Sequence, residues 1–174
     1  MDTQKKLFVS LIVLLSIGML DSLFLVYEHF SPTASKYCTF GEGFDCGIVN
    51  KSPYANLDGI SYLLTIDFKL PIPLIDIAGL GVFFDLVTSN AFLGFLTLLF
   101  ILLLLIARYE KKGFLWVKYE KTTAWIKGLL IFGVIYGFYL FLIQHFILKT
   151  YCLFCLFLDL ILLIGLILAW RLKK

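Results

Sequence analysis

The chain has 174 residues, of which 61% are hydrophobic and 16% are charged. A water-soluble globular domain carries about 25% charged residues, so this composition excludes an ordinary soluble enzyme and indicates an integral membrane protein. The formal net charge is only +3, and we expect no nucleic-acid binding from it.

Four apolar segments are long enough to cross a membrane. They cover residues 7–27, 91–107, 129–147 and 152–170, each close to the roughly 20 residues that a hydrocarbon core of about 30 Å requires. A segment in lipid must be helical, because lipid offers no partner for free backbone groups. The sequence therefore predicts an all-α integral membrane protein, a four-transmembrane-helix bundle that forms a single domain over residues 1–174.

The lysine and arginine residues predict how the bundle is oriented. Of the fifteen, all but Lys36, Lys51, Lys69 and Lys149 lie before the first segment, between the second and third, or after the fourth. Basic residues concentrate on the cytoplasmic side of membrane proteins. We therefore expect both termini in the cytoplasm, with a prokaryotic plasma membrane favoured over the endoplasmic reticulum.

Residues 28–70 form the main non-cytoplasmic region in this topology. They are rich in Gly, Pro, Ser, Asn and Asp, which is typical of turns, and a short helix is expected near residues 60–68. Residues 71–90 are apolar, but a further crossing there would move the basic connection that follows to the outer side. We expect residues 71–90 to form a surface or re-entrant helix, or the outer part of a broken second helix, since Asp76 and Asp85 favour a partly wet position.

All four cysteines fall on the predicted outer side. Cys38 and Cys46 lie in the loop, and Cys152 and Cys155 lie at the mouth of the last helix. Disulfides persist on this oxidising side, so two redox pairs are predicted. At a helix start, Cys152 would face unsatisfied N–H groups that stabilise a thiolate. Cys155, three residues on, shares its helical face and can exchange electrons with it.

Two other classes of protein fit part of this pattern. Four thiolates can bind zinc, but the Cys38-x7-Cys46 spacing is longer than a usual zinc knuckle, and no histidine lies beside either pair. His29 and His145 are expected to be interfacial, and no metal is expected. A claudin-like structural tetraspan protein with a loop disulfide is similar in outline. This class of protein, however, gives no role to the CxxC motif.

The order of these motifs resembles the vitamin K epoxide reductases and their prokaryotic homologues. The resemblance rests on Cys38-x7-Cys46, on Ser52 within Lys51-Ser52-Pro53-Tyr54-Ala55, on Gly59, and on the late Cys152-x-x-Cys155. It implies that a thioredoxin-fold partner passes electrons to the loop pair, that Cys46 exchanges with Cys152, and that Cys155 faces a membrane quinone. Ser52 matches a family serine thought to act at the quinone end; a serine that caps the turn before Pro53 is the alternative.

Given the quinone that this resemblance implies, Asp159 is the candidate proton donor of the site. Together with the CxxC cysteines it follows an i, i+3, i+7 pattern and shares their helical stripe. Reduction of a quinone consumes two protons, and an ionisable group within a membrane is functional by default. The alternative is a hydrogen bond to a neighbouring helix. A quinone pocket also needs flat apolar walls with a few polar groups, for which the candidates are Phe154, Tyr139 and, as a hydrogen-bond partner, Gln144.

Two departures from the family pattern qualify this resemblance. Members that reduce vitamin K carry Thr-Tyr-Ala soon after the CxxC motif, where this chain reads Leu158-Asp159-Leu160. A respiratory ubiquinone or menaquinone is therefore expected ahead of a vitamin K type quinone. Many bacterial members also carry a fused thioredoxin domain, and since the sequence stops at Lys174, the partner is expected to be a separate protein.

Overall fold

The computed structural model describes residues 3–31, 38–39, 43–68 and 76–172. Its long helices are α1 (Thr3–Phe30), α5 (Asn90–Tyr109), α6 (Tyr119–Ile143) and α7 (Leu153–Trp170). A π-helical turn, Gln144–Leu148, prolongs α6. Four helices in the described part of the chain are long and apolar enough to cross a membrane, which confirms the predicted fold class.

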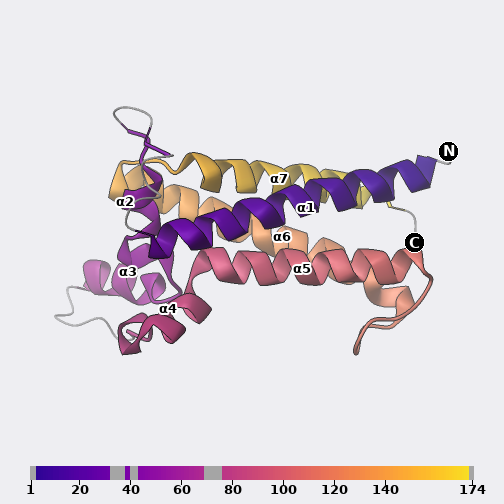
Figure 1. Cartoon of the computed structure of the whole chain (residues 1–174), viewed down its shortest axis with the longest axis horizontal. Coiled ribbons are helices and arrows are strands. Elements are labelled where there is room, and N and C mark those ends of the chain that lie inside the picture. The colour runs from indigo at the N-terminus through magenta and orange to yellow at the C-terminus, as the bar shows by residue number, and fades with distance from the viewer. Residues whose placement is uncertain (1–2, 32–37, 40–42, 69–75, 173–174) are drawn as a thin grey trace.

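The four long helices form a bundle in which α1 packs along α5 and α7, and α6 packs along the same two helices (Figure 1). The core between them is apolar and includes the fully buried residues Leu11, Leu15, Ile101, Leu104, Ile126 and Leu130. The outward faces are equally apolar: Val13 on α1 is 54% exposed and Phe132 on α6 is 62% exposed. A helix that is hydrophobic all round belongs in a membrane rather than in water.

The helices extend beyond the segments predicted from apolar runs. α6 begins at Tyr119 rather than near residue 129, and its first turns contain Glu120, Lys121 and Lys127. These charged residues lower the mean hydropathy of this stretch. They do not interrupt the helix, because its polar end lies outside the hydrocarbon. Hydropathy marks the point at which a helix enters the hydrocarbon layer. The predicted segment therefore starts later than the helix itself.

Short helices cover one end of the bundle. They are α2 (Cys46–Asn50), α3 (Gly59–Phe68) and α4 (Val82–Thr88). Figure 1 shows them gathered at the end opposite to the start of α1, the end of α7 and the α5–α6 connection. The loop elements therefore form a cap beside the start of α7.

Within residues 71–90, the described part forms a 3-10 turn, Ala78–Leu80, followed by α4. Residues 71–75 lie outside the described part of the chain. α4 has seven residues, too few to cross a membrane, and the side chains of Leu80, Val82 and Phe83 are 70–75% exposed. Ser89 then caps α5, because its hydroxyl accepts a hydrogen bond from Phe92 N at 3.3 Å.

Gly59 makes a close approach that a side chain would prevent. A Cβ there would lie 2.8 Å from Tyr54 Cα, a backbone atom. We expect Gly59→Ala to destabilise the protein by about 1–3 kcal/mol, because the turn at Pro53–Ala55 must shift. Thermal unfolding of the purified protein in detergent measures this. The matched control is Gly128→Ala in α6, where a Cβ meets no atom within 4 Å; equal melting temperatures for the two variants would contradict the packing described.

Candidate redox site

The loop pair is held at the entrance to α2. Cys38 and Cys46 form a disulfide with a Cα–Cα distance of 5.5 Å. Thr39 and Asp45 pair as an isolated antiparallel bridge beside it, and the Asp45 carboxylate caps α2 by accepting a hydrogen bond from Ile48 N at 3.1 Å. Side-chain capping starts α2 at Cys46, so the second loop cysteine lies at the first position of a helix.

A short main-chain pairing ties this loop to the residue before the CxxC motif. Tyr151 N donates to Gly43 O at 2.9 Å, and Asp45 N donates to Tyr151 O at 3.0 Å, which makes Phe44 and Tyr151 a parallel bridge. Segments more than one hundred residues apart in the sequence are thereby aligned. Cys46 and Cys152 each follow the paired segment by one residue. They therefore lie in the same part of the cap.

The CxxC motif opens α7 as the sequence predicted. Cys152 is the N-cap residue, and its Sγ accepts a hydrogen bond from Cys155 N at 3.1 Å. The same two cysteines form the second disulfide, with a Cα–Cα distance of 5.2 Å. Cys152 N donates to Gln144 Oε1 at 2.8 Å, so the π-helical turn at the end of α6 fixes the start of α7. Such turns are frequent at functional sites.

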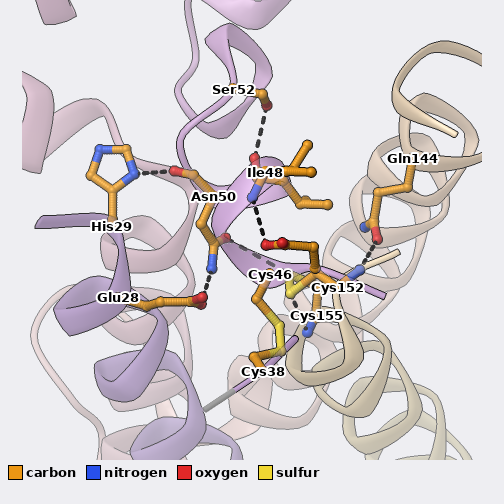
Figure 2. The surroundings of a disulfide bond; sticks show 12 residues. Glu28, His29, Cys38, Cys46, Ile48, Asn50, Ser52, Gln144, Cys152 and Cys155 are labelled. Atoms are coloured by element: carbon orange, nitrogen blue, oxygen red, sulfur yellow. Dashed lines mark hydrogen bonds between the residues drawn. A yellow bond between two sulfur atoms is a disulfide. The ribbon is translucent and has the colours of Figure 1, made fainter. Parts of the chain in front are cut away.

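Both cysteine pairs meet in one buried cluster. Cys38, Cys46 and Cys152 are fully buried, and they cluster with the buried residues Leu25 of α1 and Val49 of α2. Cys155 is partly buried and packs against this cluster, and Figure 2 shows the two cysteine pairs next to each other. The structure therefore brings together the four cysteines that the sequence singled out.

Cys155 differs from the other three cysteines because it lines a cavity. This cavity, here called the thiol cavity, has a volume of about 80 Å³. Its polar lining residues are Asn50, Ser52, Tyr54, Asn90, Gln144 and Asp159, and the rest of the wall is mainly aliphatic. A mostly apolar cavity with a few polar groups is typical of a small-molecule site.

A second cavity adjoins the first between α5, α6 and α7. This bundle cavity has a volume of about 250 Å³ and shares Asn90, Leu140, Leu158 and Asp159 with the thiol cavity. Asp159 therefore lies where the two cavities meet. It packs against α6 at Gly137, where an added Cβ would lie 2.9 Å from Asp159 Cγ, so the missing side chain leaves room for the carboxyl group.

Asn90, which sequence reasoning missed, lies at the same junction. Tyr136 OH donates to Asn90 Oδ1 at 2.7 Å, and Asn90 Nδ2 donates to Tyr54 O at 2.9 Å. The chain of hydrogen bonds runs from α6 through the first residue of α5 to the turn after α2. Burial raises the pKa of the Tyr54 phenol above its ordinary value.

A second polar network links the end of α1 to α2 and α4. Asn50 Nδ2 donates to Glu28 Oε2 at 2.7 Å, and His29 Nδ1 contacts Asn50 O (Figure 2). His29 Nε2 lies 3.0 Å from Asp85 Oδ1, which also accepts a hydrogen bond from Asn56. The side chain of His29, which is expected to be interfacial, is only 9% exposed and joins three elements of the cap.

Of the remaining predicted site residues, two line the thiol cavity and two line neither cavity. Gln144 and Ser52 line the thiol cavity, and Ser52 Oγ donates to Val49 O at 2.8 Å rather than capping the turn that follows. Phe154 instead packs on Phe24 with ring centroids 4.7 Å apart. Tyr139 neighbours Tyr136 at 5.7 Å. Neither Phe154 nor Tyr139 is among the lining residues of the two cavities.

The part of the chain that the structure describes contains no group of three or more His, Cys, Asp or Glu side chains that could hold a metal ion. All four cysteines are taken up by the two disulfides. The chemistry of this donor set is therefore that of thiol–disulfide exchange.

Fold and site together define a four-helix membrane protein that carries two redox-capable cysteine pairs side by side at one end of the bundle. The model of the vitamin K epoxide reductase family matches residues 9–170, nearly the whole chain, and the protein belongs to this family. Comparison with curated proteins gave no significant match. Membership implies a thiol–disulfide oxidoreductase linked to quinone chemistry, and it favours this class over the claudin-like and zinc-binding alternatives.

The contact between Gln144 and Cys152 can be tested by removing its acceptor. We expect Gln144→Leu to cost about 1–3 kcal/mol of stability, because it leaves the buried Cys152 N–H without a partner. Thermal unfolding in detergent measures the loss. Gln144→Glu retains a carbonyl-type acceptor and serves as the control; a Gln144→Leu protein as stable as the wild type would show that this bond does not hold the start of α7.

Proposed function

We propose that the protein oxidises the dithiol of a separate thioredoxin-fold partner and reduces a membrane quinone, and so supports disulfide-bond formation. Electrons enter at Cys38 and Cys46, pass from Cys46 to Cys152, and leave from Cys155 to the quinone. Overall, a partner dithiol and a quinone become a partner disulfide and a quinol. Two electrons and two protons move in each turnover, so the reaction balances without a metal.

The observation that carries this proposal is the unequal surroundings of the two CxxC cysteines. Cys152 is fully buried in a cluster with both loop cysteines, which suits exchange of disulfides between the pairs. Cys155 instead lines the thiol cavity, which suits contact with a small apolar oxidant. The same pair can thus face a protein disulfide on one side and a quinone on the other.

The two adjoining cavities support a quinone as that oxidant. A quinone ring needs an apolar slot with hydrogen-bond partners for its carbonyl oxygens, and Asn90, Gln144 and Ser52 line the thiol cavity. The bundle cavity is bounded by α5, α6 and α7 with aliphatic and aromatic side chains, which suits an isoprenoid tail. Ubiquinone or menaquinone is the proposed acceptor, ahead of a vitamin K type quinone, because Asp159 replaces the tyrosine of the vitamin K-reducing pattern.

Asp159 is proposed as a proton donor to the quinone. It lies at the junction of the cavities, within reach of a bound ring, whereas a carboxyl group used only for helix packing would not need to face a cavity. The proposed orientation puts both termini in the cytoplasm and the cap on the outer side of a prokaryotic plasma membrane. The basic residues at the opposite end from the cap support it.

Cysteine variants test the electron route. We expect Cys155→Ala to abolish quinol formation with any thiol donor, because no second thiol remains to close the disulfide. Cys38→Ala should block electrons from a thioredoxin-fold partner while small thiols such as dithiothreitol still reduce the CxxC pair directly. The measurement is quinone absorbance with purified protein in detergent, and wild-type rates in both variants would refute the route.

Asp159→Asn tests the proton donor. We expect quinone reduction to slow by about 100-fold, the usual contribution of a positioned general acid, while reduction of the CxxC disulfide by dithiothreitol is unaffected. The matched control is Asp21→Asn, since Asp21 is a carboxyl group of another long helix, 8% exposed, but lines neither cavity. If Asp159→Asn and Asp21→Asn have the same quinone rate, Asp159 is a packing residue.

A further inference from the structure

Glu28, in the last turn of α1, is a fully buried carboxyl group. Asn50 Nδ2 donates to its Oε2 at 2.7 Å, and its Oε1 has no hydrogen-bond partner among the described residues. A buried polar atom without a partner costs free energy and calls for an explanation. Helix packing alone does not supply one, because an apolar side chain would pack there without this cost.

Asn50 is held from two sides by α1. Its main-chain oxygen contacts His29, and its side-chain amide nitrogen is bound to Glu28. A carboxylate can only accept hydrogen bonds, so it must face the nitrogen end of the amide. The oxygen end is therefore turned the other way, where Asn50 Oδ1 lies 3.8 Å from Cys155 Sγ. Figure 2 shows the Asn50 side chain between Glu28 and Cys155.

α2 thus meets both cysteines of the CxxC motif. Cys46 and Asn50 are four residues apart and share one face of this short helix. Cys46 joins the buried cluster of Cys152, and Asn50 contacts Cys155. Asn50 and Cys155 also line the thiol cavity, whereas Glu28 does not.

We propose that Glu28 is a positioning residue for the quinone step: it orients the Asn50 amide so that Oδ1 accepts the S–H of reduced Cys155 and holds that thiol at the cavity wall. The inference rests on the proposed role of Cys155 as the quinone-facing thiol. In this step the thiols of Cys152 and Cys155 form a disulfide, and their two electrons and two protons convert the quinone to quinol. Glu28 and Asn50 are unchanged by it.

The test compares Glu28→Leu, Asn50→Leu and the double variant of the full chain in detergent, with dithiothreitol as donor and a short-chain ubiquinone as acceptor. We expect each single variant to lower kcat for quinol formation by about tenfold, the usual effect of losing a buried hydrogen bond. KM for the quinone should stay unchanged in Glu28→Leu, because Glu28 does not line the cavity. The double variant should be no slower than Asn50→Leu, because Glu28 acts through Asn50.

A second measurement separates positioning from a general structural role. Reduction of the Cys152–Cys155 disulfide by dithiothreitol, followed by alkylation and mass spectrometry, should proceed at the wild-type rate in Glu28→Leu. Glu28→Gln keeps an acceptor for Asn50 Nδ2 and should restore most of kcat. The control is Glu120→Leu, at the opposite end of the bundle in the first turn of α6.

Three results would overturn the proposal: an unchanged kcat in Glu28→Leu, additive losses in the double variant, or equal slowing of disulfide reduction and quinol formation. If Glu28→Leu does not purify in folded form, Asn50→Ser removes the same amide with a smaller change, and a wild-type kcat in that variant also overturns it. Failure of the proposed function is recognised separately, because Cys155→Ala would then form quinol at the wild-type rate.

Discussion

The site depends on the main-chain pairing between Gly43–Asp45 and Tyr151. Two hydrogen bonds, of 2.9 and 3.0 Å, align a loop after α1 with the residue before the CxxC motif. They join segments more than one hundred residues apart, and they add a fixed alignment to the packing of α2 against α1 and α7. Main-chain hydrogen bonds do not involve the side chains. They can therefore hold the cap in place while the cysteines exchange disulfides.

The membrane explains why so many polar groups at this end of the bundle are paired. Lipid satisfies no backbone group, and the break between α6 and α7 exposes several. Gln144 satisfies Cys152 N, and its own main-chain oxygen accepts from Thr150 N at 3.3 Å. The π-helical turn and the left-handed Lys149 (φ 52°) reverse the chain within a few residues. Gln144 also lines the thiol cavity, so one side chain serves both the chain reversal and the site.

Much of the fold could be predicted because lipid imposes a simple rule on sequence. The four apolar segments correspond to the four long helices, and the CxxC motif opens α7, as its position after a polar break indicated. Asn50 was harder, since α2 has five residues and shows no helical period in the sequence. Glu28 gave no signal at all: a carboxylate at a helix end is expected to face water, and its burial follows only from how α2 packs on α1. The place of Asp159 opposite Gly137 likewise depends on the pairing of α6 with α7.

The chemical division between Cys152 and Cys155 follows from helix geometry. An N-cap residue has its side chain at the helix end, among the elements that cap the bundle, whereas a residue in the first turn points sideways at a neighbouring helix. A CxxC motif that begins at the N-cap therefore gives its two sulfurs different neighbours without any special residues. In this protein the neighbours are the loop pair for Cys152 and, for Cys155, a cavity with Asn50 at its wall.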